Sequence, residues 1–393
     1  MISKRVGLYL HIPFCVQKCN YCDFLSFPST EQEKQWYVEK LNQEIKERSY
    51  LLKGRSVDTV FLGGGTPSLF SGAQIEGIME NINRYSNIEE NAEITMEMNP
   101  ATVTKDSLAA YRAAGVNRIS FGVQSMKNEE LALLGRIHRV EEFLKNYQAA
   151  REVGFDNINL DLMLALPNQT MKDVAYNIEE AVKLAPEHLS CYGLIIEEGT
   201  PFYEKYQEQE ERRQAGEEQP GDELPDEILE RNMYQWTYEY LKDAGYEQYE
   251  ISNYSKKGYE CRHNLKYWDR GEYLGFGLGA ASFLEDKRWC NISDRKTYLS
   301  LDMKTQQEKL VTEEEVIDTT SAMEEFMFLG LRKIKGISMK TFAETFGVEY
   351  KEIYGKVHRE MLAKGLLIQD GDRVYLSRQG IDVSNYVMGE FMG

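Results

Sequence analysis

The chain has 393 residues, of which 42% are hydrophobic and 28% are charged. This composition allows a large buried core and excludes a wholly disordered chain. The formal net charge of −18 disfavours binding to the phosphate backbone of nucleic acids, so we expect no nucleic-acid partner. No apolar run reaches the roughly 18 residues of a transmembrane helix, and the first residues lack the apolar segment of a signal peptide. We therefore expect a cytoplasmic protein, for which peripheral contact with a membrane stays open.

Six short segments rich in apolar and β-branched residues recur in the first half of the chain, each followed by a segment with helical patterning. They span residues 6–11, 59–62, 93–98, 118–122, 158–163 and 188–194. Thr30 and Glu33 have the spacing of a capping box, which predicts the start of the first helix. Strands that alternate with helices indicate an α/β fold with a parallel sheet. The functional residues of such a sheet gather at the carboxyl ends of its strands.

Changes in composition divide the chain into four parts. Residues 1–205 hold the six strand–helix units. Residues 206–226 are polar, acidic and aperiodic, which is typical of a solvated loop or linker. Residues 227–310 begin with a helical pattern and continue into an aromatic, glycine-rich stretch that we expect to extend the first unit. Residues 311–393 have the pattern of three helices and a hairpin, which predicts a smaller winged-helix-like domain.

Three of the six cysteines, Cys15, Cys19 and Cys22, lie within eight positions directly after the first expected strand. Thiolates suit iron–sulfur clusters and zinc, but structural zinc sites want four ligands, usually in two separated pairs. Three thiolates on a [4Fe–4S] cluster leave one iron without a protein ligand, and an open iron can bind a small molecule. The spacing therefore favours an iron–sulfur cluster, with a zinc site or unliganded thiols as the alternatives.

This C-x3-C-x2-C spacing resembles that of the radical S-adenosylmethionine (SAM) proteins. The resemblance implies a partial (β/α)6 TIM-like barrel in which the cysteines hold a [4Fe–4S] cluster and SAM binds the open iron. Five further motifs are similar to those of the oxygen-independent coproporphyrinogen III oxidases and their relatives: residues 9–15 (YLHIPFC), 63–68 (GGGTPS), 97–100 (EMNP), 121–125 (FGVQS) and 161–167 (DLMLALP).

Two features distinguish the chain from the oxidases within this group. The oxidases carry a fourth cysteine two residues after the third, where this chain has Phe24. Residues 263–268 (HNLKYW) resemble the HNxxYW motif of the HemW family of haem chaperones. The resemblance therefore favours the chaperones over the oxidases.

The resemblance also implies which residues contact SAM. Glycines let the backbone approach a ligand closely, and the family places Gly64, Gly65 and Thr66 against SAM. Glu97 is expected beside the charged methionine end of SAM, although a structural salt bridge is an alternative for a buried acid. The remaining expected contacts lie around the cluster or at strand ends, and some of them serve a second SAM molecule in the oxidases: Tyr9, Tyr21, Gln124, Arg136 and Asp161.

His263 is the residue that we connect with haem. Neutral imidazole is a common axial ligand of haem iron, and aromatic side chains suit a flat porphyrin. From the residues alone, a packed polar group is the alternative. His138 and His358 stand in charged stretches, and we expect them to be solvated.

The implied function is that of a haem chaperone that delivers haem to acceptor haemoproteins such as respiratory enzymes. Its cofactors would be the [4Fe–4S] cluster, SAM and haem. It would also need a partner that donates electrons to the cluster. No residue is assigned a catalytic role. The first alternative is an oxygen-independent coproporphyrinogen III oxidase, which decarboxylates coproporphyrinogen III to protoporphyrinogen IX. A radical SAM enzyme with an unrelated substrate and a non-enzymatic zinc module are the others.

Overall fold

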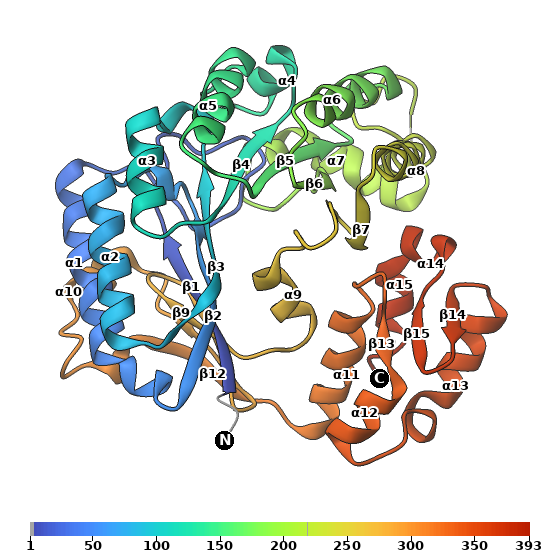
Figure 1. The fold of residues 1–393 in the computed structure, drawn as a ribbon. Helices are drawn as coiled ribbons and strands as arrows, with labels where there is room; N and C mark the ends of the chain where they lie inside the picture. The colour runs from blue at the N-terminus through green and yellow to red at the C-terminus, as the bar shows by residue number, and fades with distance from the viewer. Residues whose placement is uncertain (1–3, 218) are drawn as a thin grey trace.

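The computed structural model describes residues 4–217 and 219–393. Its main sheet is built around six parallel strands that lie side by side in chain order (Figure 1). The six predicted strands are confirmed to within a few residues, and most of their side chains are buried on both faces, as in parallel sheets covered by helices. The strands are β1 (Lys4–Ile12), β2 (Arg55–Gly64), β3 (Ile88–Met98), β4 (Arg118–Gln124), β5 (Ile158–Leu164) and β6 (His188–Gly193).

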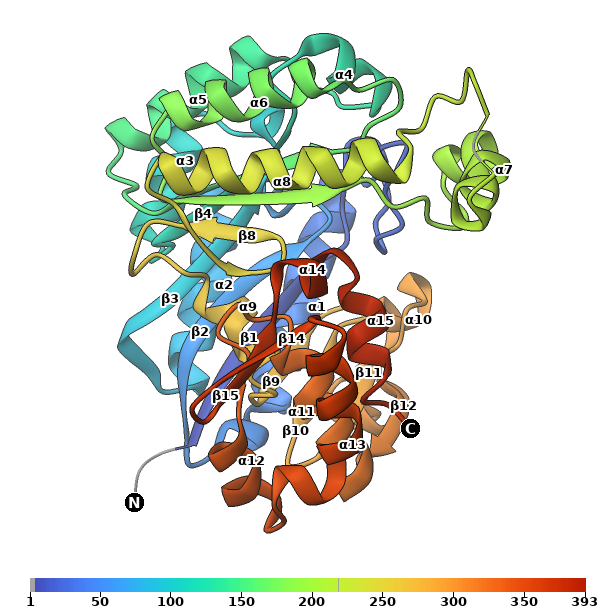
Figure 2. The ribbon, with the colours of Figure 1, turned by 90° about the vertical axis from the view of Figure 1, so that its right-hand side faces the viewer.

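Helices cover the outer face of this curved sheet (Figures 1 and 2). Several begin with a side chain that accepts the hydrogen bond of a free backbone N–H, as Thr30 does in the capping box predicted for α1. The helices of this layer are α1 (Glu31–Glu47), α2 (Gly72–Tyr85), α3 (Lys105–Ala113), α4 (Asn128–Leu133), α5 (Val140–Glu152), α6 (Met171–Lys183) and α8 (Glu227–Asp243), joined in places by the 3-10 helices η1 (Ser49–Leu52), η2 (Pro67–Leu69) and η3 (Pro100–Thr102).

The barrel is open, because β6 pairs with β8 instead of closing onto β1. Two strands extend the sheet beyond β6, and four antiparallel or parallel strands extend it beyond β1. These are β8 (Asn253–Ser255) and β7 (Glu247–Glu250) on one side, and β9 (Tyr273–Phe276), β10 (Ala281–Leu284), β11 (Lys287–Asn291) and β12 (Val311–Val316) on the other, with α10 (Arg295–Ser300) and η4 (Gln307–Lys309) between the last two. The short helix α9 (Arg262–Trp268) lies within the curve of the sheet (Figure 1).

The expected linker at residues 206–226 is helical in its first half. Helix α7 (Pro201–Ala215) ends at Gly216, which takes the left-handed conformation (φ +69°) common after helices. The helix is missed by hydrophobic periodicity because it buries few side chains, namely Phe202 and Tyr206. Among the described residues, the loop is therefore confined to Gly216, Glu217 and residues 219–226.

The C-terminal part folds around a hydrophobic core of its own. The three predicted helices and the hairpin are confirmed, and the hairpin turns at Gly371 (φ +54°). Because β12 pairs with β11, the main sheet reaches residue 316, and the C-terminal domain starts later than the expected residue 311. Its elements are α11 (Thr319–Gly330), β13 (Ile337–Ser338), α12 (Met339–Phe346), α13 (Tyr350–Ala363), β14 (Leu367–Asp370), β15 (Arg373–Leu376), α14 (Arg378–Asp382) and α15 (Ser384–Gly389). Within the described residues, no helix has the length and apolar character needed to cross a membrane.

A buried carboxylate attaches the strands beyond β1 to the barrel. Glu44 on α1 accepts hydrogen bonds from Gly277 N (2.9 Å) and Asn291 Nδ2 (2.7 Å). It also accepts from the Tyr298 hydroxyl (2.7 Å) and lies 3.4 Å from the Arg48 guanidinium. A buried charge is tolerated when its lone pairs are all engaged in this way.

Glu44→Ala is expected to lower the free energy of unfolding by about 3–5 kcal/mol, because it leaves several buried donors unpaired. Urea unfolding followed by circular dichroism measures the change. Glu39→Ala, at an exposed position of the same helix, is the control and should change stability by less than about 0.5 kcal/mol. Equal, small effects of the two substitutions would show that the carboxylate does not attach these strands.

Candidate functional site

A cavity of about 400 Å³ opens at the carboxyl ends of the six parallel strands. Its volume is in the range of small-molecule sites. Each strand, or the loop that follows it, contributes lining residues, as expected for this edge of such a sheet. The residues singled out in the sequence that line the cavity are Cys15, Cys19, Cys22, Tyr21, Gly64, Gly65, Thr66, Glu97, Gln124, Arg136 and Asp161.

The three cysteines lie on the loop that connects β1 to α1. Cys22 N donates to Cys19 O (3.3 Å), which folds the loop back on itself. Asn20 N donates to Leu134 O (3.0 Å), which anchors the loop to the end of α4. The thiols of Cys15, Cys19 and Cys22 are free and partly exposed. The loop therefore presents three available thiols to one cavity.

The surroundings of these thiols fit an iron–sulfur cluster. Arg136 Nη1 lies 3.5 Å from Cys19 Sγ, so a guanidinium group lies beside one of the three sulfurs. Thr66 Oγ1 lies 3.4 Å from Cys15 Sγ, within hydrogen-bonding reach of a sulfur. Among the residues that the structure describes, no three Cys, His, Asp or Glu side chains converge closely enough to hold a single metal ion. A cubane needs no such convergence, because each thiolate binds a different iron atom.

Two glycines bring the end of β2 against the cysteine loop. Gly65 N donates to Ile12 O (2.8 Å), and a Cβ atom on Gly65 would lie 2.6 Å from Phe14 O. Gly64 has a φ of +106°, and a Cβ atom there would lie 2.4 Å from the His11 ring. These positions require glycine, because any side chain would push the two segments apart.

Two carboxyl groups, on Glu97 and Asp161, face the cavity from β3 and β5. Burial and the neighbouring Asp161 raise the pKa of Glu97 to about 7, although Gly64 N donates to its Oε2 (3.0 Å). Burial also raises the pKa of Asp161, against hydrogen bonds from Asn159 Nδ2 (2.7 Å) and Ser120 Oγ (3.0 Å). A positively charged ligand group would relieve the repulsion between these carboxylates.

Arg136 offers the opposite charge to the same cavity. Its Nη2 donates to Gly122 O (2.5 Å). Its Nε is buried and has no hydrogen-bond partner within the described part of the chain. Buried donors normally have a partner, so this atom indicates an acceptor supplied by a ligand. Together with the two carboxyl groups, it makes the cavity complementary to a ligand that carries both an ammonium and a carboxylate group.

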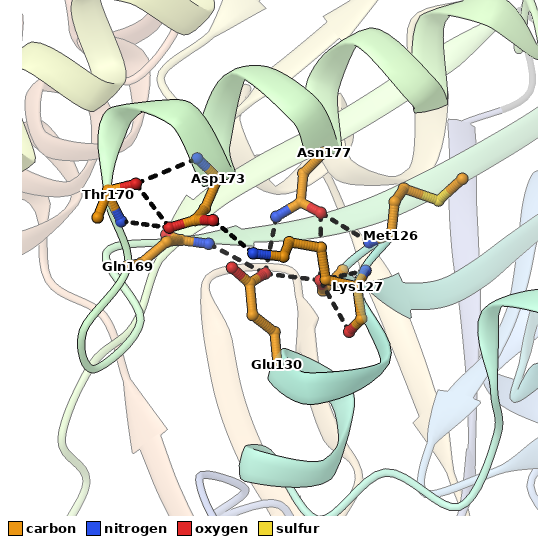
Figure 3. A network of polar contacts seen from close by, with 8 residues as sticks. Met126, Lys127, Glu130, Gln169, Thr170, Asp173 and Asn177 are labelled. Carbon is orange, nitrogen blue, oxygen red and sulfur yellow. Dashed lines mark hydrogen bonds and ion pairs between the residues drawn. The ribbon is translucent and has the colours of Figure 1, made fainter.

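Gln124 is held in an unusual backbone conformation at the end of β4. Its φ is +67°, in the left-handed region that residues other than glycine rarely adopt. Its Oε1 accepts a hydrogen bond from the Tyr192 hydroxyl (2.8 Å). The next residues belong to a polar network with α4 and α6 (Figure 3), in which the buried Glu130 carboxylate accepts from Ser125 Oγ (2.6 Å) and Asn177 Nδ2 (2.7 Å). This network fixes the loop that carries Gln124.

Tyr9 is absent from the residues that line the cavity, and it supports the cysteine loop from behind. Its hydroxyl donates to His11 Nδ1 (3.0 Å), and His11 Nε2 donates to Leu25 O (2.9 Å). Burial lowers the pKa of His11, which keeps this ring neutral. The pair therefore connects β1 to the far end of the cysteine loop.

His263, the expected haem ligand, lies inside the barrel on α9 and is 1% exposed. Its Nδ1 lies 2.8 Å from Thr59 Oγ1, and its Nε2 lies 2.9 Å from the Tyr267 hydroxyl. Burial lowers its pKa to about 3, so the ring is neutral. Because both ring nitrogens are engaged, His263 has no lone pair free for iron in this arrangement. The geometry does not support the expected haem ligation by this residue.

The prediction that two other histidines are solvated is wrong. His138 and His358 are 2% and 3% exposed. Burial and the nearby Arg136 lower the pKa of His138 to about 3. His358 Nε2 lies 3.0 Å from Gln369 Oε1 in the C-terminal domain. Charged neighbours in the sequence therefore do not predict exposure here.

Several lining residues of the cavity were missed in the sequence. Ser120 and Gly122 line it from β4, and Tyr192 lines it from the end of β6. A usable signal was present for Tyr192, because it stands near the carboxyl end of a predicted strand. Gly122 had the same signal, because it ends the predicted strand 118–122 and lies within the 121–125 motif. Ser120 carries no such signal, since the direction of its side chain depends on the register of β4.

Comparisons with known proteins match nearly the whole chain. Residues 9–181 match the model of the radical SAM superfamily, and residues 317–383 match that of the HemN C-terminal domain. The heme chaperone HemW of Bacillus subtilis (strain 168) is 37% identical over 386 residues, which cover 98% of each chain. The heme chaperone HemW of Escherichia coli (strain K12) is 42% identical over 276 residues, which cover 70% of this chain and 69% of the other.

One solved structure shares the fold along almost the full length. The coproporphyrinogen III oxidase HemN of Escherichia coli, a radical SAM enzyme, has a TM-score of 0.84 with this chain at 24% sequence identity. The match covers 99% of this chain and 90% of that chain. The expected α/β barrel with a smaller C-terminal domain is thereby confirmed.

Glu97→Gln is expected to stabilise the metal-free protein at alkaline pH. Because the pKa of Glu97 is raised from 4.5 to about 7, its contribution to stability is fully present below 4.5 and is lost as the pH rises through 7. The variant should therefore be more stable than the parent protein by about 1–3 kcal/mol at pH 8.5, with a smaller difference at pH 5.5. Urea unfolding across this pH range measures the difference.

Glu76→Gln, at an exposed position of α2, is the matched control and should show no pH-dependent difference. If Glu97→Gln behaves like this control at every pH, the pKa of the Glu97 carboxyl group is not raised in the folded protein.

Proposed function

This chain belongs to the HemW family within the radical SAM superfamily, and we propose that it is a haem chaperone, which binds haem and delivers it to acceptor haemoproteins. The observation that carries the proposal is the similarity to haem chaperones along nearly the whole chain, including α9 and the C-terminal domain. Respiratory enzymes are the acceptors that we propose. Delivery to them would take place in the cytoplasm, at times at the membrane surface.

The cavity at the strand ends suits the two cofactors of the superfamily. Cys15, Cys19 and Cys22 would hold a [4Fe–4S] cluster, which in its reduced form supplies the electron for the chemistry of SAM. Glu97 would accept a hydrogen bond from the ammonium group of SAM, and the free Nε of Arg136 would donate one to the carboxylate of SAM. The other residues that we propose to surround SAM are Tyr21, Gly64, Gly65, Thr66, Gln124 and Asp161, with Tyr9 as a support.

Glu97 would respond to the charge of its ligand. With a pKa near 7, its carboxyl group is partly protonated at neutral pH. An ammonium group within contact favours the ionised form and would lower this pKa. Binding of a cationic ligand would therefore release a proton from Glu97.

Phe24 favours the chaperone over the second candidate, an oxygen-independent coproporphyrinogen III oxidase. It stands where the similar oxidases have a fourth cysteine, and it lines the mouth of the cavity with 59% of its surface exposed. A phenyl ring provides no ligand to iron. Val16 and Ile195 are also exposed at this mouth or next to it, and we propose that this apolar rim receives a protein partner, either the electron donor or the acceptor of haem.

The anaerobically reconstituted protein is expected to bind haem in a stoichiometric ratio, to pass it to an apo-form of a respiratory haemoprotein, and to form no protoporphyrinogen from coproporphyrinogen III. The Soret band follows binding, and the activity regained by the acceptor follows transfer. Cys22→Ser should lose cluster iron and sulfide, whereas Cys290→Ser, outside the cavity, should keep both.

Two outcomes would contradict the proposal. Absence of haem binding by the reconstituted protein would remove the chaperone function. Formation of protoporphyrinogen that depends on SAM would identify the chain as an oxidase instead.

A further inference from the structure

A second cavity lies at the seam between the main sheet and the C-terminal domain. Its volume is about 430 Å³, within the range of small-molecule sites. Tyr273 and Phe283 line it from β9 and β10, and Phe328 lines it from α11. Tyr267, at the end of α9, completes this aromatic wall and packs edge-on against Tyr273, with ring centres 4.6 Å apart. A flat apolar ligand would find aromatic contacts from both sides of the seam.

Two arginines bring positive charge to this aromatic cavity. The guanidinium carbon of Arg270 lies 4.7 Å from the ring centre of Phe283, and that of Arg288 lies 5.7 Å from the same ring. The side chain of Arg270 is 12% exposed and that of Arg288 is 36% exposed. The two guanidinium groups are thus held on one wall, and Arg288 remains open to solvent.

A single carboxylate of the protein bridges the two guanidinium groups. Glu325 Oε2 accepts from Arg270 Nε (2.8 Å), and Glu325 Oε1 lies 2.8 Å from Arg288 Nη2. Arg270 is also paired with Asp286 (2.9 Å). Glu325 is on α11, so this bridge joins the C-terminal domain to the segments of the main sheet that carry the arginines. The guanidinium groups of Arg270 and Arg288 could donate in the same way to the carboxylate of a ligand that reaches the position of Glu325.

We propose that this cavity binds the carboxylate edge of haem, with Arg270 and Arg288 exchanging Glu325 for a haem propionate. The planar donor groups of arginine match a carboxylate whether it belongs to the protein or to a ligand. The aromatic wall would pack against the macrocycle. This inference rests on the proposed function, because it takes haem as the cargo of the protein.

The exchange has a consequence for delivery. Haem has to displace an internal carboxylate, so the cavity binds it more weakly than an unoccupied pair of arginines would. The displacement also breaks a contact between the main sheet and α11, which couples loading of haem to loosening of the domain seam. Moderate affinity for haem, and a domain contact that loosens when haem binds, suit a protein that transfers its ligand to an acceptor.

Titration of the full-length protein with haemin, followed at the Soret band, tests the exchange. Arg288→Gln, the more exposed of the two arginines, is expected to raise the dissociation constant about tenfold. Glu325→Gln is expected to lower it severalfold, because the arginines lose their internal competitor. Haemin dimethyl ester, which has no free carboxylate, should bind the parent protein at least as weakly as haemin binds Arg288→Gln, because the ester loses the contacts with both arginines.

Arg378→Gln is the matched control, since this arginine also stacks on an aromatic ring, that of Tyr238, away from the cavity. It should bind haemin like the parent protein. Equal affinities of Arg288→Gln, Glu325→Gln and the control, or equal binding of haemin and its ester, would overturn the inference. Dependence on Arg288 for coproporphyrin III but not for haemin would overturn it as well.

These outcomes are separate from a failure of the proposed function, in which the parent protein binds no haemin at all. If Arg288→Gln fails to fold, the Glu325→Gln and ester comparisons still decide between the two results.

Discussion

The candidate site depends on one backbone contact, between the end of β2 and the segment that leads from β1 into the cysteine loop. Gly65 N donates to Ile12 O (2.8 Å) and Thr66 N donates to Phe14 O (2.7 Å). Cys15 is the residue after Phe14, so these backbone hydrogen bonds fix the position of its main chain. The absence of a Cβ atom on Gly65 makes this approach possible. The contact places the thiols and the glycine segment on the same cavity.

The interior of the barrel holds buried groups of opposite charge that compensate one another. Arg118 is fully buried beside Glu93 and Asp161, and the Glu93 carboxylate accepts the backbone N–H groups of Arg262 and His263 (3.0 Å each). The helix α9 is therefore tied to the same strands whose ends form the cavity. Asp161, which faces the cavity from β5, also interacts electrostatically with Arg118.

The sequence predicted what depends on local pattern, and it missed what depends on tertiary packing. The six strands and the cysteine loop follow from apolar runs and from the spacing of Cys15, Cys19 and Cys22. The burial of His263 could not be read locally, since its partners Thr59 and Glu93 are 204 and 170 residues away in the chain. Helix α7 was missed because its apolar contacts are few, and the second cavity because its walls come from two domains.

Electron paramagnetic resonance of the reduced, anaerobically reconstituted protein, recorded with and without SAM, shows whether the cluster has an iron atom open to SAM. If Cys15, Cys19 and Cys22 hold a [4Fe–4S] cluster whose fourth iron is open, the signal of the cluster is expected to change when SAM is added, because SAM binds that iron. A cluster signal that is indifferent to SAM, or zinc in place of iron, would contradict this assignment.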